Sequence, residues 1–227
     1  YSGEVVRAQG QWYNSMREGH NIIVSREPVG VVAAITPWNF PIALPAWKVA
    51  AALAYGNTVV LKPSTFVPGS VVMLARLLEQ AGLPAGVFNL VMGDGRTTGD
   101  AMIDAADAVT FTGGTETGKA VIRRAAETMT KVQLELGGKN ALVVLDDADL
   151  DQAVDLAANG AWIQTGQRCT GTERFIVTKG IHDAFVERIA KVAAGYKVGH
   201  ALDAATQIGP VANAPQFNAN LQFVQDA

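Results

Sequence analysis

The feature that most constrains the fold of this chain is an alternation of short apolar runs, rich in β-branched residues, with longer segments of helical periodicity. The run 31–36 (VVAAIT) predicts a buried strand, and the segment 43–56 predicts a helix that ends at Gly56. The same pattern predicts strands at 58–62, 87–93, 107–113 and 131–138, and helices at 69–82 and 115–128. Such alternation predicts an α/β fold with a mainly parallel sheet and flanking helices.

The second half of the chain predicts the start of another α/β domain. Its expected elements are a strand followed by an acidic helix start within 141–149, a helix at 150–166, a strand at 174–179 and a helix at 182–195. We therefore expect a first domain at 1–136 and an incomplete second domain at 137–227, divided by topology rather than by a change in composition. The segment 1–28 is polar and predicts little structure beyond a short strand after residue 20. Because the chain lacks an initial Met and its last residues resemble the middle of a helix, we expect a piece of a longer protein.

Composition excludes several classes of function. The net charge is −3 with both signs interspersed, so nucleic acid is not an expected partner. No apolar run approaches the length of a membrane span, and the three His have no metal-ligand spacing, so neither a membrane partner nor a metal site is expected. One Cys cannot form an internal disulfide, which is typical of a reducing compartment, and we expect a cytoplasmic protein.

Unusual residues gather where the predicted strands end. Ligands of open parallel sheets bind at the carboxyl ends of the strands. That rule indicates five short segments, namely 36–41, 62–65, 93–95, 112–115 and 135–138.

Cys169, within GQRCTGT, is the only cysteine. A thiolate is a strong nucleophile, and a neighbouring cation such as Arg168 favours that form. A lone cysteine can equally be an inert, buried small residue. Arg168 could also anchor a carboxylate-bearing substrate, or it could be a solvated or structural group.

Glu135 lies in LELGGK, at the end of an otherwise apolar strand. A buried acid is unfavourable unless it is paired or used, and burial would raise its pKa toward the range of a general base. The alternative is an ion pair with a neighbour such as Lys139.

Asn39 lies in TPWNFP, between two prolines that stiffen the loop. Its amide could donate to an oxyanion, or it could cap a turn. In FTGGTETG (111–118), Gly113 and Gly114 lie between a strand and a helix, where a phosphate could bind, although this is no GxGxxG fingerprint. Lys62 in LKPS could reach a ribose or phosphate, or be solvated.

Five motifs, TPWNFP, LKPS, FTGGTETG, LELGGK and GQRC, occur in one order along the whole chain, which thereby resembles the aldehyde dehydrogenase superfamily. The resemblance implies a Rossmann-like cofactor domain followed by the first part of a catalytic domain. It implies that Cys169 attacks the aldehyde to give a thiohemiacetal and then a thioester. Asn39 and the Cys169 backbone N–H would hold the oxyanion, Glu135 would activate water, and Lys48 would belong to the proton path.

The resemblance also implies NAD or NADP as cofactor and a small aldehyde as substrate. The residues that it assigns to the cofactor are Ile35, Thr36, Pro37, Trp38, Lys62, Ser64, Thr65, Gly95, Thr112, Gly113, Gly114, Thr117, Leu136 and Gly137. Within the superfamily, the sequence of this chain is most similar to those of 2-oxoglutarate semialdehyde (2,5-dioxopentanoate) dehydrogenases. Succinate semialdehyde and betaine aldehyde dehydrogenases have similar sequences in the same segments.

Two positions depart from the family pattern. Many members have Ser at the position of Gly114, so one hydroxyl contact to phosphate would be lost. Many NAD-preferring members have Glu at the position of Thr65, where it accepts from the ribose and would repel a 2′-phosphate. Thr65 removes that repulsion, so we expect NADP to be tolerated or favoured.

The family chain is about twice as long, so the resemblance implies that these residues alone are poorly active. It also implies that 10–28 form an arm to other subunits of a homodimer or homotetramer. Two other hypotheses remain open. A thiol hydrolase or acyltransferase would need a His near Cys169, for which the sequence offers no persuasive candidate. A non-catalytic dinucleotide-binding module would not depend on Cys169.

Overall fold

The computed structural model describes residues 2–7 and 10–226. The chain divides into two compact units, Tyr1–Leu136 and Gly137–Ala227. The assignment of the first unit to cofactor binding and of the second to catalysis stays a prediction. Within the described residues, no helix is both long and apolar enough to cross a membrane.

The first unit is built on a five-stranded sheet in which every neighbouring pair is parallel, in the order β5-β4-β3-β6-β7. Its strands are β3 (Val31–Ile35), β4 (Thr58–Lys62), β5 (Phe88–Leu90), β6 (Ala108–Gly113) and β7 (Lys131–Leu136). Its helices are α1 (Ala43–Ala54), α2 (Pro68–Gln80), α3 (Asp100–Ala105) and α4 (Thr115–Glu127). The predicted α/β class with a parallel sheet is confirmed.

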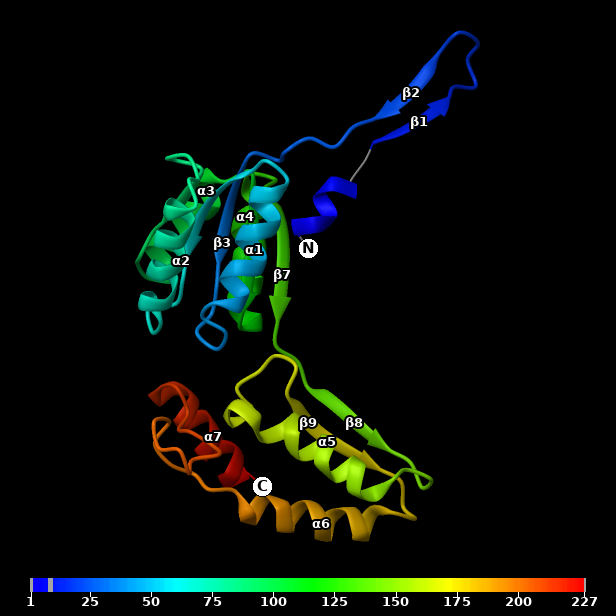
Figure 1. Ribbon diagram of the computed structural model, residues 1–227, viewed down its shortest axis with the longest axis vertical. Helices are drawn as coiled ribbons and strands as arrows, with labels where there is room; N and C mark the ends of the chain where they lie inside the picture. The colour runs from blue at the N-terminus through cyan, green and yellow to red at the C-terminus, as the bar shows by residue number, and fades with distance from the viewer. Residues whose placement is uncertain (1, 8–9, 227) are drawn as a thin grey trace. The chain divides into compact units, whose positions relative to one another are not determined.

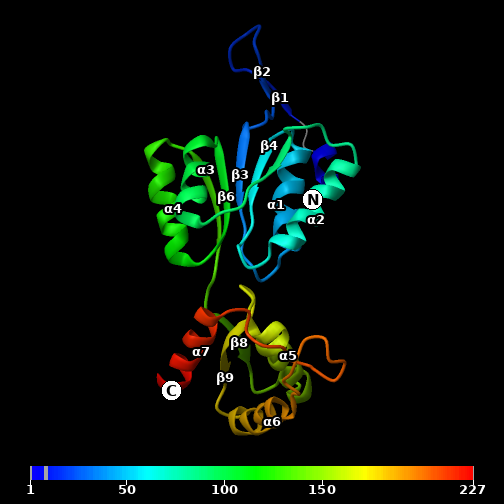
Figure 2. The same cartoon turned by 90° about the vertical axis from the view of Figure 1, so that its left-hand side faces the viewer.

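Helices cover both faces of this sheet, with α1 and α2 on one side and α3 and α4 on the other (Figure 2). The period-2 alternation of β3 explains the two layers, because consecutive strand residues point to opposite faces. Ala33 and Ile35 pack into the core beneath α3 and α4, whereas Ala34 packs into the core beneath α1 and α2. Both faces are buried, which is why the strand is apolar throughout.

The segment between β5 and β6 differs most from the prediction. The strand predicted at 87–93 pairs only over Phe88–Leu90, because β5 is an edge strand whose partner β4 ends at Lys62. The chain then turns at Gly93, whose φ of +150° favours glycine. A π-helical turn (Gly95–Gly99) leads into α3, which we did not predict because its approach is rich in Gly and Thr.

A β-hairpin precedes the sheet. It pairs β1 (Gln11–Asn14) with β2 (Asn21–Val24), and a 3₁₀ helix (Ser2–Arg7) precedes it. The sequence indicated β2 but not β1, because polar residues flank the two apolar side chains of β1. The apolar side chains of the hairpin are exposed in this structure, including Trp12 of β1 at 66% and Ile23 of β2 at 68%.

The second unit contains the parallel pair β8 (Asn140–Val144) and β9 (Thr172–Val177), with α5 (Leu150–Trp162) lying along it (Figure 1). The remaining elements are the 3₁₀ segment Ile163–Gly166, α6 (His182–Gly195) and α7 (Ala214–Asp226).

One predicted element in this unit was too long. Within 141–149 the strand ends at Val144, and the predicted acidic helix start is present, because Asp149 caps α5 by accepting from the Gln152 N–H at 3.0 Å. The helix predicted at 150–166 ends at Trp162, because Gln164 and Thr165 have left-handed backbone angles that an α-helix excludes.

Phe185 is the anchor of the second unit's core. Its side chain is 1% exposed and packs edge-on against Phe175, with ring centroids 5.6 Å apart. We expect Phe185→Ala to lower the free energy of unfolding of this unit by about 3–5 kcal/mol. Hydrogen exchange of the α5 and α6 amides measures the loss. Phe217→Ala, at a side chain that is 51% exposed, is the matched control, and equal protection in both variants would contradict the expectation.

Candidate functional site

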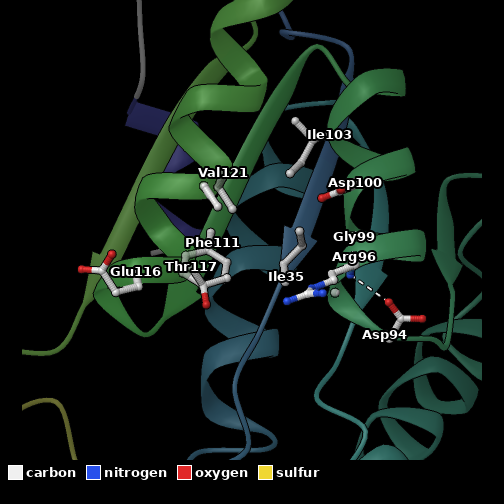
Figure 3. Close-up of a pocket in the computed structure, with 12 residues that line it drawn as sticks. Ile35, Asp94, Arg96, Gly99, Asp100, Ile103, Phe111, Glu116, Thr117 and Val121 are labelled. Carbon is white, nitrogen blue, oxygen red and sulfur yellow. Dashed lines mark hydrogen bonds between the residues drawn. The ribbon is translucent and has the colours of Figure 1, made fainter.

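A cavity of about 600 Å³ opens beside the carboxyl ends of β3 and β6. Its walls are apolar side chains from the sheet, α3 and α4, and its rim is polar (Figure 3). The lining residues are Ile35, Asp94, Gly95, Arg96, Gly99, Asp100, Ile103, Phe111, Glu116, Thr117, Ala120 and Val121. An apolar slot with a few polar groups at its mouth suits a planar ring that carries charged substituents.

The N-terminus of α4 lies at this cavity. Gly114 is its N-cap and provides no side-chain cap for the backbone N–H groups of the first turn. Such an end attracts an anion, and a phosphate fits it. Gly113 has a packing reason of its own, because a Cβ there would lie 2.5 Å from the Phe111 ring.

Lys62 is buried rather than solvated, at 6% exposure. Its Nζ donates to the carbonyl oxygens of Pro63 and Gly93, both at 3.1 Å. Burial lowers the pKa of Lys62, and the nearby Asp94 carboxylate opposes that shift. The Lys62 stem passes close to the cavity at Gly99, where a Cβ would lie 3.9 Å from Lys62 Cε, an ordinary van der Waals contact.

The loop 94–97 is the part of the rim that our sequence prediction largely missed. Asp94 accepts from the backbone N–H groups of Arg96 (2.8 Å) and Thr97 (2.9 Å) and from the Thr97 hydroxyl (2.6 Å). Hydrogen bonds from Thr97 and Arg96 lower the pKa of Asp94. The loop thereby places the Arg96 guanidinium at the cavity. The sequence DGRTT (94–98) could have indicated this turn, since Asp is a common N-cap of helical turns.

Two buried hydroxyls mark the ends of neighbouring strands. Thr36 and Thr112 are 4% and 6% exposed, and their Oγ1 atoms have no hydrogen-bond partner among the described residues. Such groups are unfavourable unless a ligand or water satisfies them.

The other predicted cofactor residues follow the strand ends. Pro37, Trp38 and Asn39 are half-buried in the loop after β3. The Ser64 hydroxyl accepts from the Phe66 N–H at 3.3 Å, and Thr65 is exposed. Leu136 packs on α4, since a Cβ at Gly118 would lie 2.7 Å from it, and Gly137 is the first residue of the second unit.

A polar chain of contacts runs across the α1 side of the sheet. Lys48 Nζ donates to Thr110 Oγ1 at 2.7 Å and to Gln133 Oε1 at 3.3 Å. Gln133 Nε2 donates to Glu135 Oε1 at 3.0 Å. Burial lowers the pKa of Lys48 to about 8, and Glu135 acts in the opposite direction.

Glu135 itself differs from expectation in two respects. In this structure the residue is exposed, because β7 is the edge strand of its sheet. Lys139, the partner proposed from the sequence, forms its ion pair with Glu173 instead, at 2.5 Å. The carboxylate is therefore held by the Gln133 amide and not by a neighbouring lysine.

Cys169 is an exposed, free thiol on a tight loop. The Asn140 side-chain amide clamps the loop by donating to the carbonyl oxygens of Cys169 (2.7 Å) and Gly171 (3.0 Å). Upstream, Gln164, Thr165 and Gly166 have φ values of 59°, 60° and 68°. Consecutive left-handed residues are strained when they are not glycine, and such strain concentrates at functional loops. The buried alternative for the thiol is contradicted by its exposure, whereas its reactivity stays a prediction.

Arg168 has a structural role. Its Nη2 donates to the carbonyl oxygens of Asn159 (2.8 Å) and Gly160 (2.7 Å), in the last turn of α5. A cation there satisfies carbonyls that the helix leaves unpaired. The suggestion that Arg168 anchors a substrate carboxylate is therefore not supported, and the structural alternative is.

The cavity brings together Ile35, Gly95 and Thr117 from the predicted set. Asn39 and Glu135 belong to the first unit and Cys169 to the second, so the convergence of these three side chains stays a prediction. Across residues 2–7 and 10–226, no group of three or more His, Cys, Asp or Glu side chains could hold a metal ion.

Comparison with known proteins gives a consistent result. A family model described as "Aldehyde dehydrogenase family" matches residues 1–227. The "Alpha-ketoglutaric semialdehyde dehydrogenase" of Bacillus subtilis is 41% identical over 227 residues, covering 99% of this chain and 46% of that protein. The "2,5-dioxopentanoate dehydrogenase" of Saccharolobus solfataricus is 42% identical over 229 residues, covering 99% and 48%.

Among solved structures, betaine aldehyde dehydrogenase from Staphylococcus aureus in complex with NAD+ superimposes with a TM-score of 0.96 at 38% identity. The match covers 98% of this chain and 45% of that one. The chain thus spans about half the length of the relatives that it matches.

Proposed function

Because the chain belongs to the aldehyde dehydrogenase family, we propose that it forms part of an enzyme that oxidises an aldehyde to a carboxylate with NAD or NADP. The observation that carries this proposal is the cavity at the carboxyl ends of β3 and β6, bounded by the uncapped N-terminus of α4. The cofactor residues are those assigned above from the resemblance, joined by Asp94 and Arg96.

The residues present fit a dinucleotide. The apolar walls suit an adenine ring, and the α4 amides suit a pyrophosphate. The Lys62 ammonium has three N–H donors, of which two bind carbonyl oxygens, and the third could bind a ribose oxygen. When bound, NAD or NADP supplies the hydride acceptor.

Cys169 is the proposed nucleophile. Its sulfur adds to the aldehyde carbon, and the Asn39 amide and the Cys169 N–H stabilise the oxyanion of the thiohemiacetal. Loss of hydride from that carbon leaves a thioester. Glu135 then takes a proton from water as the water oxygen attacks the thioester carbonyl, the C–S bond breaks, and the thiolate and a carboxylate product are released.

For the substrate we propose 2-oxoglutarate semialdehyde, oxidised to 2-oxoglutarate. Support comes from the two relatives above, 41% and 42% identical, whose names refer to this aldehyde. The betaine aldehyde dehydrogenase neighbour supports a second candidate, and succinate semialdehyde is a third. Values of kcat/KM for the three aldehydes, measured on an enzyme of full family length that carries this sequence, decide among them. A preference for betaine aldehyde would contradict the first choice.

Thr65 is the residue from which we predict tolerance of, or preference for, NADP. Replacing it with Glu places a carboxylate where a 2′-phosphate would lie, and opposed like charges cost several kcal/mol. We expect Thr65→Glu to shift the ratio of kcat/KM for NADP over NAD by about 10- to 100-fold toward NAD. Thr65→Gln has the same length as the Glu variant without its charge and should leave the ratio nearly unchanged. An equal shift in both variants would show that charge is not the cause.

We further propose that 1–136 is the cofactor domain and that 137–227 begins the catalytic domain. The hairpin within 10–28 would join subunits of a homodimer or homotetramer, and its exposed Trp12 and Ile23 support that role. The single cysteine supports a cytoplasmic location.

A further inference from the structure

Gln133 is a polar residue in the middle of β7 that neither the sequence motifs nor the proposed chemistry uses. Residues 131, 133 and 135 alternate along β7 with Val132, Leu134 and Leu136, which pack against the α3–α4 core. Gln133 and Glu135 therefore share the opposite face, toward α1. The register pairs Gln133 with Thr110 and Glu135 with Thr112.

The contacts of Gln133 fix the orientation of its amide. Its Oε1 accepts from the Lys48 ammonium (3.3 Å) and from the Thr110 hydroxyl (2.5 Å). Because the oxygen is engaged by two donors, the NH₂ end must point the other way, and it donates to Glu135 Oε1 at 3.0 Å. Rotation of the amide would place its NH₂ against the Lys48 ammonium, which can only donate, and its oxygen against a carboxylate.

The surrounding charges agree with this arrangement. Lys131 lies on the same face of β7, and the 3₁₀ helix that contacts α1 carries Glu4 and Arg7, which pair with each other at 2.6 Å. Glu135 is the group that raises the pKa of Lys48 against the effect of burial. Gln133 lies between this cation and this carboxylate and hydrogen-bonds to both.

We propose that Gln133 is a positioning residue for Glu135: its amide, held by Lys48 and Thr110, orients the carboxylate that activates water for thioester hydrolysis. The inference rests on the proposed function. Gln133 touches neither substrate nor cofactor in this proposal, and it acts only through Glu135. Hydrolysis of the acyl-enzyme, and not its formation, should therefore depend on it.

The test compares Gln133→Glu and Gln133→Leu in an enzyme of full family length that carries this sequence. Gln133→Glu keeps acceptors for Lys48 and Thr110 but cannot donate to Glu135, whereas Gln133→Leu removes both sets of contacts. We expect the first-turnover rate of NAD(P)H formation to stay near wild type in both variants. We expect the rate of thioester hydrolysis to fall about 10- to 100-fold, because a displaced catalytic group loses about that factor.

Lys131→Gln, on the same face of the same strand, is the matched control and should behave as wild type. Thermal unfolding of each variant checks that the fold is kept. If Gln133 only held Lys48 in place, Gln133→Glu would hydrolyse the thioester at the wild-type rate, and the proposal would be overturned. Equal losses in the first turnover and in hydrolysis would overturn it as well. A wild-type protein without NAD(P)-dependent aldehyde oxidation would instead reject the proposed function.

Discussion

Replacing Cys169 with alanine is expected to lower kcat for aldehyde oxidation by at least about 10⁴-fold, because removal of a covalent nucleophile leaves only binding and oxyanion stabilisation. The exposed thiol lies on a loop that Asn140 clamps through two carbonyl oxygens, so a change of side chain should leave the backbone in place. Steady-state production of NAD(P)H measures the loss.

Cofactor affinity is the control for Cys169→Ala, since the cavity lies entirely in the first unit and should bind NAD(P) as before. Protein fluorescence on addition of NAD(P)H reports it. A variant that retained more than a tenth of the activity would leave the thiol no covalent role.

Replacing Glu135 with glutamine should stop the cycle at the thioester. The amide has the same shape but cannot take a proton from water, and general-base catalysis contributes about 10²- to 10⁴-fold. We expect one rapid turnover of NAD(P)H per active site, followed by a steady rate lower by about that factor. Rapid mixing resolves the two phases, and mass spectrometry should detect the acyl group on Cys169.

Glu127→Gln, an exposed carboxylate on α4, is the matched control for Glu135→Gln and should show the wild-type steady rate. A variant of Glu135 that lost the first turnover as well would assign the carboxylate to an earlier step. The predictions for Thr65 and Gln133 are independent of this test, because neither cofactor preference nor the positioning of Glu135 decides whether the thioester forms.

The sequence predicted the central strands β3 and β4 well because they bury both faces. Val59 and Leu61 are fully buried, and such positions tolerate only apolar residues, so the strands stand out as apolar runs. α3 escaped prediction because Gly95 and Gly99 precede it, and its six residues are too short to show a period. β1 escaped because its two large apolar side chains lie between polar neighbours.

The candidate site was predictable where a residue carries its own chemistry. Cys169 and Asn39 could be singled out because a lone thiol and a proline-bracketed amide are unusual in themselves. Gln133 and Asn140 could not, because their importance lies in what they contact across 85 and 29 positions of sequence, respectively. The role of Arg168 was ambiguous because the orientation of a side chain on a loop cannot be predicted from the adjacent residues. In the structure its guanidinium donates to carbonyl oxygens of α5.

The left-handed turn before Cys169 has a consequence for attempts to make such an enzyme heat-tolerant. Glycine at position 165 would relieve about 1–2 kcal/mol of steric conflict, but it would also add conformational freedom to the unfolded chain, which offsets part of that gain. The same change removes the Thr165 hydroxyl, which donates to the Gly209 carbonyl oxygen at 3.0 Å, and loosens the approach to the thiol. Thr165→Gly is therefore a poor route to heat tolerance, because the relief of strain is offset while the loop before the thiol becomes more mobile.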